Sequence, residues 1–122
     1  MKCCETGGYT SSVDDAASIE EVRHVLEGCK VVFLVFYVES CGICRAFLPI
    51  YESVAGRFHG SAAFLRVDAN RLLELASALG VMSVPSTIVV INGRLAGFFS
   101  GFLDEDRLMN IVERTLEYAG CL

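Results

Sequence analysis

The amino-acid sequence predicts one α/β domain, with a central mixed β-sheet of four to five strands flanked by about four helices. Three observations lead to this fold class. The chain has 122 residues and is 53% apolar, which suits a single domain with one core. Strand-like and helix-like apolar patterns alternate up to Gly80, as in strands joined by helices. After Gly80, two strand-like segments joined by Asn92-Gly93 precede a helical segment, which predicts an antiparallel hairpin and a final helix.

Composition and charge exclude several classes of protein. The longest apolar run, Val31–Val38, is much shorter than the roughly 20 residues that cross a bilayer. The net charge is −5 and no stretch is basic, so neither nucleic acid nor a membrane is an expected partner. The segment before Ala16 lacks the apolar core of a secretory signal, so a reducing, cytoplasmic location is expected. Residues 1–8 are expected to be a flexible N-terminal tail, and residues 9–122 a single domain.

The first elements are predicted from short local patterns. Tyr9–Val13 is expected to be a short edge strand. Ser18 has capping-box spacing to Glu21 and is expected to start a helix that Gly28 ends. Val31–Val38 is apolar on both faces and rich in β-branched and aromatic residues, which is typical of a central strand covered on both sides.

The later elements follow from apolar periodicity and turn residues. Proline inside a helix removes a hydrogen bond, so the helix that contains one is expected to bend. The expected elements are a helix from Cys41 to about His59 with Pro49 inside it, a strand at Ala62–Asp68, a helix at Asn70–Leu79, strands at Thr87–Ile91 and Leu95–Phe99, and a last helix that begins near Asp104.

Two cysteines, Cys41 and Cys44, stand at the start of a predicted helix, just after the predicted central strand. The unpaired N–H groups and the dipole of a helix start stabilise an anion. The pKa of the Cys41 thiol is therefore expected to be lowered, which makes Cys41 the candidate nucleophile. Cys44 lies one turn further in and can form a disulfide with it. In thiol–disulfide exchange, Cys41 would attack a target disulfide to give a mixed disulfide, and Cys44 would then attack Cys41 and release the reduced target.

A metal half-site and two ordinary buried thiols are the alternatives for this pair. Structural zinc normally takes four ligands arranged as two pairs. Cys3 and Cys4 are adjacent, and His24 and His59 are isolated, so none of them completes such a set. A redox centre is therefore favoured. No metal is expected, and no cofactor beyond the redox-active disulfide.

A second feature lies far downstream. Val84-Pro85 directly precedes the predicted strand Thr87–Ile91. Proline cannot donate to a sheet, so it belongs at a strand start or edge, and its peptide bond there is a candidate for the cis form. The backbone of Val84 would then be available to pair with an extended substrate segment. Taken alone, a Val-Pro pair is more often a plain turn.

Together these motifs resemble the thioredoxin family, over nearly the whole chain from about Tyr9 to Tyr118. The resemblance implies the thioredoxin fold and a protein-disulfide reductase. No single motif is decisive, but their order and spacing are specific. The similar motifs are the active-site stretch Phe36–Arg45, the helix proline Pro49, the cis-proline loop Val84-Pro85-Ser86-Thr87, the hairpin turn Asn92-Gly93 and the late glycine Gly101.

The resemblance also implies partners and a substrate groove. Electrons would come from an NADPH-dependent flavoprotein reductase and pass to protein disulfides, so the expected roles are electron transport and cell redox homeostasis. A monomer is expected. The residues implied to line the groove are Ser40, Gly42, Ile43, Met82, Val84, Pro85, Gly101 and Phe102.

Four positions depart from the family pattern. Ser40 stands where the family usually has tryptophan, and Ile43 stands where it has proline. The pair between the cysteines tunes the redox potential, so this pair is expected to be less reducing than usual. Val35 replaces the family's buried aspartate, and Phe64 replaces the lysine that pairs with it. We therefore expect slower resolution by Cys44, or help from Glu39 acting through water.

These departures leave a second function open. A non-catalytic binding or chaperone module could keep the fold and use the Val84-Pro85 groove for docking. The apolar residues expected around the groove favour a protein-docking surface in either case.

Four further cysteines are given no role: Cys3, Cys4, Cys29 and Cys121. Cys29 could be a small buried hydrophobe. The terminal cysteines could pair with each other, link a dimer or stay unpaired. A reducing compartment favours unpaired thiols.

Overall fold

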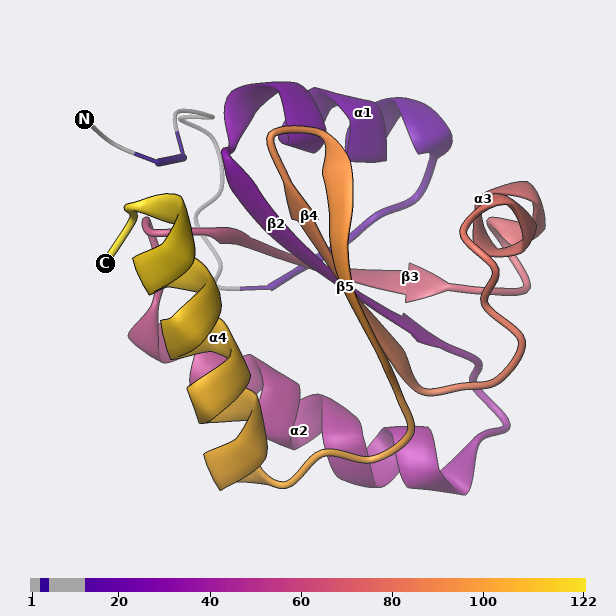
Figure 1. Cartoon of the computed structure of the whole chain (residues 1–122). Coiled ribbons are helices and arrows are strands. Elements are labelled where there is room, and N and C mark those ends of the chain that lie inside the picture. Colours follow the sequence, from indigo (N-terminus) through magenta and orange to yellow (C-terminus); the bar gives the residue numbers. More distant parts are fainter. Residues whose placement is uncertain (1–2, 5–12) are drawn as a thin grey trace.

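A computed structural model describes residues 3–4 and 13–122 (Figure 1). Strands and helices alternate as far as α3, and a hairpin and a helix follow, as predicted. Within the described residues, no helix is long and apolar enough to cross a membrane. The elements are β1 (Asp14–Asp15), α1 (Ile19–Gly28), β2 (Val31–Tyr37), α2 (Gly42–Arg57), β3 (Ala63–Asp68), α3 (Leu73–Ala78), β4 (Ser86–Ile91), β5 (Arg94–Ser100) and α4 (Glu105–Ala119).

The described strands form one sheet in the order β1-β3-β2-β4-β5. β3 runs parallel to both β1 and β2, whereas β4 is antiparallel to β2 and β5 is antiparallel to β4. The turn of the β4–β5 hairpin is Asn92-Gly93, with φ angles of 51° and 76°. Both are in the left-handed region that a two-residue hairpin turn of this kind requires. The predicted mixed sheet and its hairpin are therefore confirmed.

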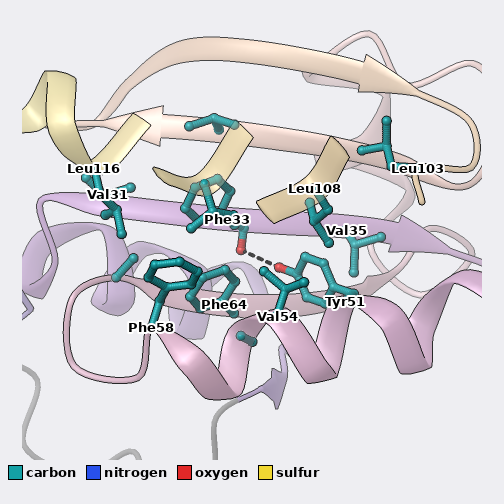
Figure 2. Packing of buried hydrophobic residues seen from close by; sticks show 14 of the residues in the cluster. Val31, Phe33, Val35, Tyr51, Val54, Phe58, Phe64, Leu103, Leu108 and Leu116 are labelled. Atoms are coloured by element: carbon teal, nitrogen blue, oxygen red, sulfur yellow. Dashed lines mark hydrogen bonds between the residues drawn. The ribbon is translucent and has the colours of Figure 1, made fainter. Parts of the chain in front are cut away.

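Strand β2 is the centre of the sheet and is buried on both faces. Its residues from Val31 to Phe36 are each at most 1% exposed. Alternate side chains enter two cores: Phe33 and Val35 pack with α2 and α4, while Leu34 and Phe36 pack with α1 and α3. Figure 1 shows these two pairs of helices on opposite faces, and Figure 2 shows the core beneath α2 and α4. The unbroken apolar run in the sequence reflects this position.

Helix α1 begins where the capping pattern predicts. The Glu21 N–H donates to the Ser18 hydroxyl at 3.2 Å, and the Glu21 carboxylate accepts from the Ala17 N–H at 2.7 Å. The end of the helix differs slightly from the prediction. Gly28 is the last helical residue and Cys29 is the C-cap, because the Cys29 N–H still bonds to the carbonyl of Val25.

Two other elements differ from the predictions by more than two residues. The predicted strand Tyr9–Val13 falls mostly outside the described residues, and the strand described at that edge, β1, begins only at Asp14. Helix α3 begins at Leu73 rather than at Asn70. The Asp68 carboxylate accepts the Asn70 N–H at 2.9 Å, so a side-chain turn replaces the first expected helical turn.

The hydroxyl of Tyr51 joins helix α2 to the sheet. It lies 3.0 Å from the carbonyl oxygens of both Phe33 and Leu65, on the neighbouring strands β2 and β3. Figure 2 shows the hydrogen bond to Phe33. The ring of Phe64 stacks on Phe33 at 4.9 Å and meets the Tyr51 ring edge-on at 5.8 Å. Burial raises the pKa of Tyr51 well above its usual value, although the hydrogen bond to Leu65 acts in the opposite direction. Tyr51 therefore stays neutral in the folded chain.

Tyr51→Phe is expected to lower the free energy of unfolding by about 1–3 kcal/mol at neutral pH, because it removes a buried hydrogen bond. Above about pH 10 the unfolded chain loses the tyrosine proton while the folded chain keeps it, so the stability of the wild type falls as pH rises. The variant should lose less stability over that range. Urea unfolding at neutral pH and above pH 10 measures both effects.

The control for this experiment is Tyr118→Phe, because the Tyr118 side chain is 85% exposed. This change should leave the free energy of unfolding at neutral pH unaltered, because Tyr118 lies at the surface. If Tyr51→Phe lost stability with pH as steeply as the wild type, the assignment of the alkaline effect to Tyr51 would be wrong.

Candidate active site

Cys41 is the N-cap of helix α2. Its Sγ accepts the N–H of Cys44 at 3.1 Å, so the sulfur occupies the anion-binding position at the helix start. Cys41 is half-buried, whereas Cys44 is 1% exposed. The N–H groups and the dipole of the helix favour a thiolate at Cys41 over one at Cys44.

Cys41 and Cys44 form a disulfide, with 5.2 Å between their Cα atoms. This separation lies inside the range that disulfides require. The cap geometry produces it, because one helical turn places the side chain of Cys44 beside the N-cap residue. The pair can therefore alternate between dithiol and disulfide without a rearrangement of the helix.

The loop before β4 lies directly against Cys41. The peptide bond between Val84 and Pro85 is cis, and the Val84 carbonyl oxygen is 3.9 Å from Cys41 Sγ. The Gly101 N–H donates to the Pro85 carbonyl at 2.7 Å. Gly101 has a φ of 90°, which side chains rarely allow, so glycine is favoured for this backbone conformation. Cys41 and Val84 are 43 positions apart in sequence, so the fold brings two distant segments together at the redox pair.

Exposed apolar side chains come from three segments near Cys41: the start of α2, the loop before β4 and the segment after β5. Ile43 is 58% exposed, Met82 96% and Phe102 47%. The ring of Phe102 contacts Phe47 of α2 edge-on at 6.0 Å, which holds it on the side of the active-site helix. These side chains give the neighbourhood of Cys41 an apolar character that a protein partner could cover.

The remaining predicted groove residues occupy different depths. Ser40 and Gly42 are exposed on either side of Cys41, and Val84 is half-buried. Pro85 is buried, so its side chain lies beneath the surface and its carbonyl serves the bond to Gly101. Glu39 is exposed, and its main-chain carbonyl accepts a hydrogen bond from the Arg45 guanidinium at 2.8 Å.

The two positions where the family's buried ionic pair is expected are apolar and buried. Val35 is 0% exposed and Phe64 is 3% exposed, and both belong to the core beneath α2 and α4. Since Phe64 also stacks on Phe33, the space is filled by packed rings and methyl groups. This part of the core offers no carboxylate of its own.

One buried polar group in this region was not anticipated. Thr87 is 0% exposed and pairs in register with Val35, so the two side chains point to the same face of the sheet. Within the described residues, the hydroxyl of Thr87 has no hydrogen-bond partner. The neighbouring hydroxyl of Ser86 is also buried but donates to the Ser83 carbonyl at 2.7 Å. In the sequence, Thr87 is simply a β-branched residue in a strand, so no signal distinguished it.

Thr87→Val is expected to raise the free energy of unfolding by about 1 kcal/mol, because a methyl group replaces an unpaired buried hydroxyl of the same shape. Ser86→Ala is the matched change on the same strand. It should lower the free energy of unfolding by about 0.5–1.5 kcal/mol, because it removes a satisfied hydrogen bond. Urea unfolding of both variants tests the contrast. A loss of stability in Thr87→Val would show that its hydroxyl has a partner in solution, such as a bound water.

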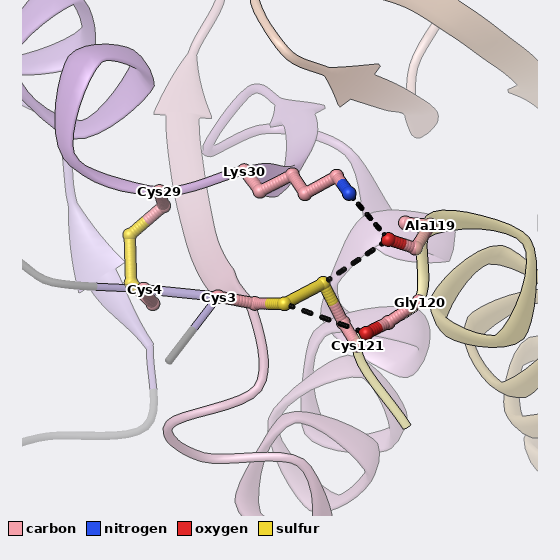
Figure 3. Close-up of a disulfide and its surroundings, with 7 residues drawn as sticks. All are labelled: Cys3, Cys4, Cys29, Lys30, Ala119, Gly120 and Cys121. Carbon is pink, nitrogen blue, oxygen red and sulfur yellow. Dashed lines mark hydrogen bonds between the residues drawn. A yellow bond between two sulfur atoms is a disulfide. The ribbon is translucent and has the colours of Figure 1, made fainter. Parts of the chain in front are cut away.

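The structure also pairs the four cysteines that were given no role. Cys3 is bonded to Cys121, and Cys4 is bonded to Cys29 (Figure 3). The expectation of unpaired thiols was therefore wrong. Pairing between the terminal segments, one of the alternatives, holds for Cys3–Cys121, whereas the pairing of Cys4 with Cys29 was not anticipated. The expectation rested on the compartment, whereas the pairing depends on how the fold brings these segments together.

Comparison with known proteins decides the family. The sequence matches the family model described as thioredoxin over residues 14–114. The chain belongs to the thioredoxin family. It is 33% identical over 110 residues to "Probable thioredoxin-2" of Caenorhabditis elegans, covering 88% of this chain and 75% of that protein. It is 30% identical over 86 residues to a thioredoxin of Borreliella burgdorferi, covering 70% of this chain and 74% of that protein.

Solved thioredoxin structures share the fold. A mutant thioredoxin from Halobacterium salinarum superimposes with a TM-score of 0.78 at 29% identity, covering 88% of this chain and 95% of that one. The expected thioredoxin fold is therefore confirmed.

The relatives also include a mitochondrial thioredoxin of Rattus norvegicus, 26% identical over 115 residues, covering 94% of this chain and 66% of that protein.

Membership of the thioredoxin family supports a redox role for the chain, as a thiol–disulfide oxidoreductase in the broad sense. Within the described residues, no group of three or more histidine, cysteine, aspartate or glutamate side chains is placed to hold a metal ion.

Proposed function

We propose that this chain reduces disulfide bonds in other proteins, with Cys41 as the nucleophile and Cys44 as the resolving cysteine. The position of Cys41 carries this proposal. Its sulfur caps helix α2 and is partly accessible, whereas Cys44 is 1% exposed. A bulky target disulfide can therefore reach Cys41 first, at the sulfur whose anion the helix start stabilises.

The reaction passes two electrons to the target. The Cys41 thiolate attacks one sulfur of the target disulfide, the target S–S bond breaks, and one target thiolate leaves. Cys44 then loses its proton and attacks Cys41 Sγ in the mixed disulfide. The second target thiolate leaves, and the Cys41–Cys44 disulfide forms. The two thiol protons end on the two thiols of the reduced target.

A target segment would dock beside the redox pair. We expect an extended chain to pair with the backbone of Val84, next to the carbonyl that lies 3.9 Å from Cys41 Sγ. Ile43, Met82 and Phe102 would contact its apolar side chains. Ser40, Gly42, Pro85 and Gly101 complete the proposed groove.

The oxidised pair must be reduced again after each cycle. An NADPH-dependent flavoprotein reductase is the proposed electron donor, and the chain would carry electrons between that enzyme and its targets as a monomer in the cytoplasm. It would need no cofactor beyond its own dithiol. Since the core behind the pair is apolar at Val35 and Phe64, we propose that Glu39 assists the deprotonation of Cys44 through water.

A binding or chaperone module is the second candidate. The exposed apolar side chains of Ile43, Met82 and Phe102 favour it, because they would serve docking without any exchange. The two functions differ in their need for the cysteines: docking alone would survive the loss of Cys41.

Cys41→Ser is expected to abolish the reduction of insulin disulfides with dithiothreitol as the electron donor, because no thiolate remains to attack. The turbidity of the released insulin chain measures the rate. Cys29→Ser, which leaves the redox pair intact, should retain a rate close to that of the wild type. Equal rates for the wild type and Cys41→Ser would exclude the reductase function and favour the binding module.

Cys44→Ser is expected to trap covalent complexes with target proteins, because the mixed disulfide on Cys41 can no longer be resolved. Non-reducing electrophoresis after incubation with an oxidised model protein measures the complex, and dithiothreitol should release it. The double variant Cys41→Ser/Cys44→Ser is the control and should trap nothing at this site. Absence of a trapped complex with Cys44→Ser would count against protein disulfides as substrates.

A further inference from the structure

Two disulfides lie at the end of the sheet where β2 begins. Cys3–Cys121 spans 118 positions of the sequence and Cys4–Cys29 spans 25 (Figure 3). Backbone hydrogen bonds also hold residues 3–4 at this end of the sheet. The Lys30 N–H donates to the Cys3 carbonyl at 2.7 Å, and Cys4 and Cys29 form an antiparallel bridge. We call these two disulfides the terminal clasp.

The two halves of the terminal clasp lie on opposite faces of the sheet. Cys121 packs on the core beneath α2 and α4, whereas Cys4 and Cys29 pack with the core beneath α1 and α3. Adjacent residues of an extended chain point to opposite sides, so Cys3 and Cys4 each meet a different partner. The same geometry argues against one metal ion bound by all four sulfurs, because the two pairs point away from each other.

Lys30 holds the same two segments that Cys3–Cys121 joins. Its N–H binds the Cys3 carbonyl, and its ammonium group donates to the Ala119 carbonyl at 2.6 Å (Figure 3). The Cys121 N–H in turn donates to the Leu116 carbonyl at 2.7 Å, which fixes the chain just after α4. Cys3 and Cys121 are therefore positioned by hydrogen bonds that do not depend on the disulfide. A reduced pair would stay close enough to close again.

The terminal clasp and the redox pair lie at opposite ends of β2. Cys29 comes just before the strand and Cys41 shortly after it, and the 7 residues of β2 span roughly 23 Å at about 3.3 Å each. Thiols at the two places cannot exchange directly within one molecule. Chemistry at the clasp is thus separate from the chemistry of Cys41 and Cys44.

From these contacts we propose that the terminal clasp is a second thiol–disulfide site, which responds to small disulfides of the glutathione class. In each pair, one thiolate attacks the small disulfide, its S–S bond breaks and one small thiol leaves. The partner cysteine then attacks the mixed disulfide, the protein disulfide forms and the second small thiol leaves. Each pair passes two electrons to the small disulfide, and its two protons end on the released thiols. Closure fastens residues 3–4 to both faces of the sheet and stabilises the fold.

The two pairs differ in access. Cys3 and Cys121 are both partly exposed, whereas Cys29 is 4% exposed and offers an incoming thiolate little approach. A thiol reagent can attack either sulfur of Cys3–Cys121 but reaches Cys4–Cys29 mainly through Cys4. A small thiol is therefore expected to reduce Cys3–Cys121 faster than Cys4–Cys29.

The test uses the full chain with Cys41→Ser/Cys44→Ser, so that only the clasp titrates. The protein is equilibrated in buffers of reduced and oxidised glutathione at stepped ratios and then alkylated. Mass spectrometry counts the free thiols, and circular dichroism gives the melting temperature at each ratio. We expect four thiols to be lost as the two disulfides close, and in a time course of reduction by glutathione we expect Cys3 and Cys121 to be the first pair to open. The melting temperature should rise by roughly 5–15 °C on full closure.

Single variants assign the pairs, because a protease does not readily cleave between the adjacent Cys3 and Cys4. In Cys3→Ser, Cys4–Cys29 should form, and Cys121, which has lost its resolving partner, should end as a glutathione mixed disulfide. In Cys4→Ser, Cys3–Cys121 should form and Cys29 should stay reduced. With all four clasp cysteines present, pairing of Cys4 with Cys121, four thiols free at every ratio, or lasting glutathione adducts in place of internal disulfides would overturn the proposal. So would closure that leaves the melting temperature unchanged.

Lys30→Met separates positioning from general stability. It should slow the closure of Cys3–Cys121 by oxidised glutathione several-fold while the closure of Cys4–Cys29 keeps its rate, because only the former depends on the bond to Ala119. Arg71→Met, which removes an exposed positive charge after β3, should change neither rate. Equal slowing of both pairs in Lys30→Met would show a loss of structure rather than of positioning. None of these measurements uses reductase activity, so they stand or fall independently of the proposed function.

Discussion

Burial of β2 on both faces is the constraint on which the rest of the molecule depends. Because its side chains alternate between two cores, helices are required on both sides of the sheet, and each helix is placed by the β2 residues that it covers. The strand also positions the groups that lie at its two ends. The chain leaves the core after Tyr37, and four residues later Cys41 caps α2. At the other end, Cys29 and Lys30 stand where both terminal segments arrive.

Much of this arrangement can be predicted from local sequence patterns. The continuous apolar run predicts β2, the Asn92-Gly93 turn predicts the hairpin, and the serine cap predicts the start of α1, since each depends on neighbours close in sequence. The position of Cys41 at a helix start follows from the same kind of pattern. The cis bond before Pro85 was anticipated as a possibility, but its contact with Cys41 depends on packing between segments far apart in sequence.

Other features could not be predicted, because they depend on which face of the sheet a residue occupies. The partners of Cys3 and Cys4 are set by the opposite directions of two adjacent side chains, and sequence alone allows several pairings. The hydroxyl of Thr87 has no partner among the described residues because its strand places it beside Val35 in an apolar core, a pairing between segments far apart in sequence. Val35 and Phe64 stand at both positions of the family's buried ionic pair, so neither position leaves a buried charge without its partner. A packed apolar pair also avoids the cost of burying two charges.

The disulfide between Cys3 and Cys121 has a mechanical consequence. It makes the chain a covalent ring from residue 3 to residue 121, with every described helix and strand inside it. Tension applied to the chain outside that ring would run through the sulfur bridge and leave the sheet unloaded. A machine that unfolds proteins by pulling on one end would therefore have to break this bond, or thread two strands of chain at once, before β2 could be extracted. Reduction would return the load to the hydrogen bonds of the fold.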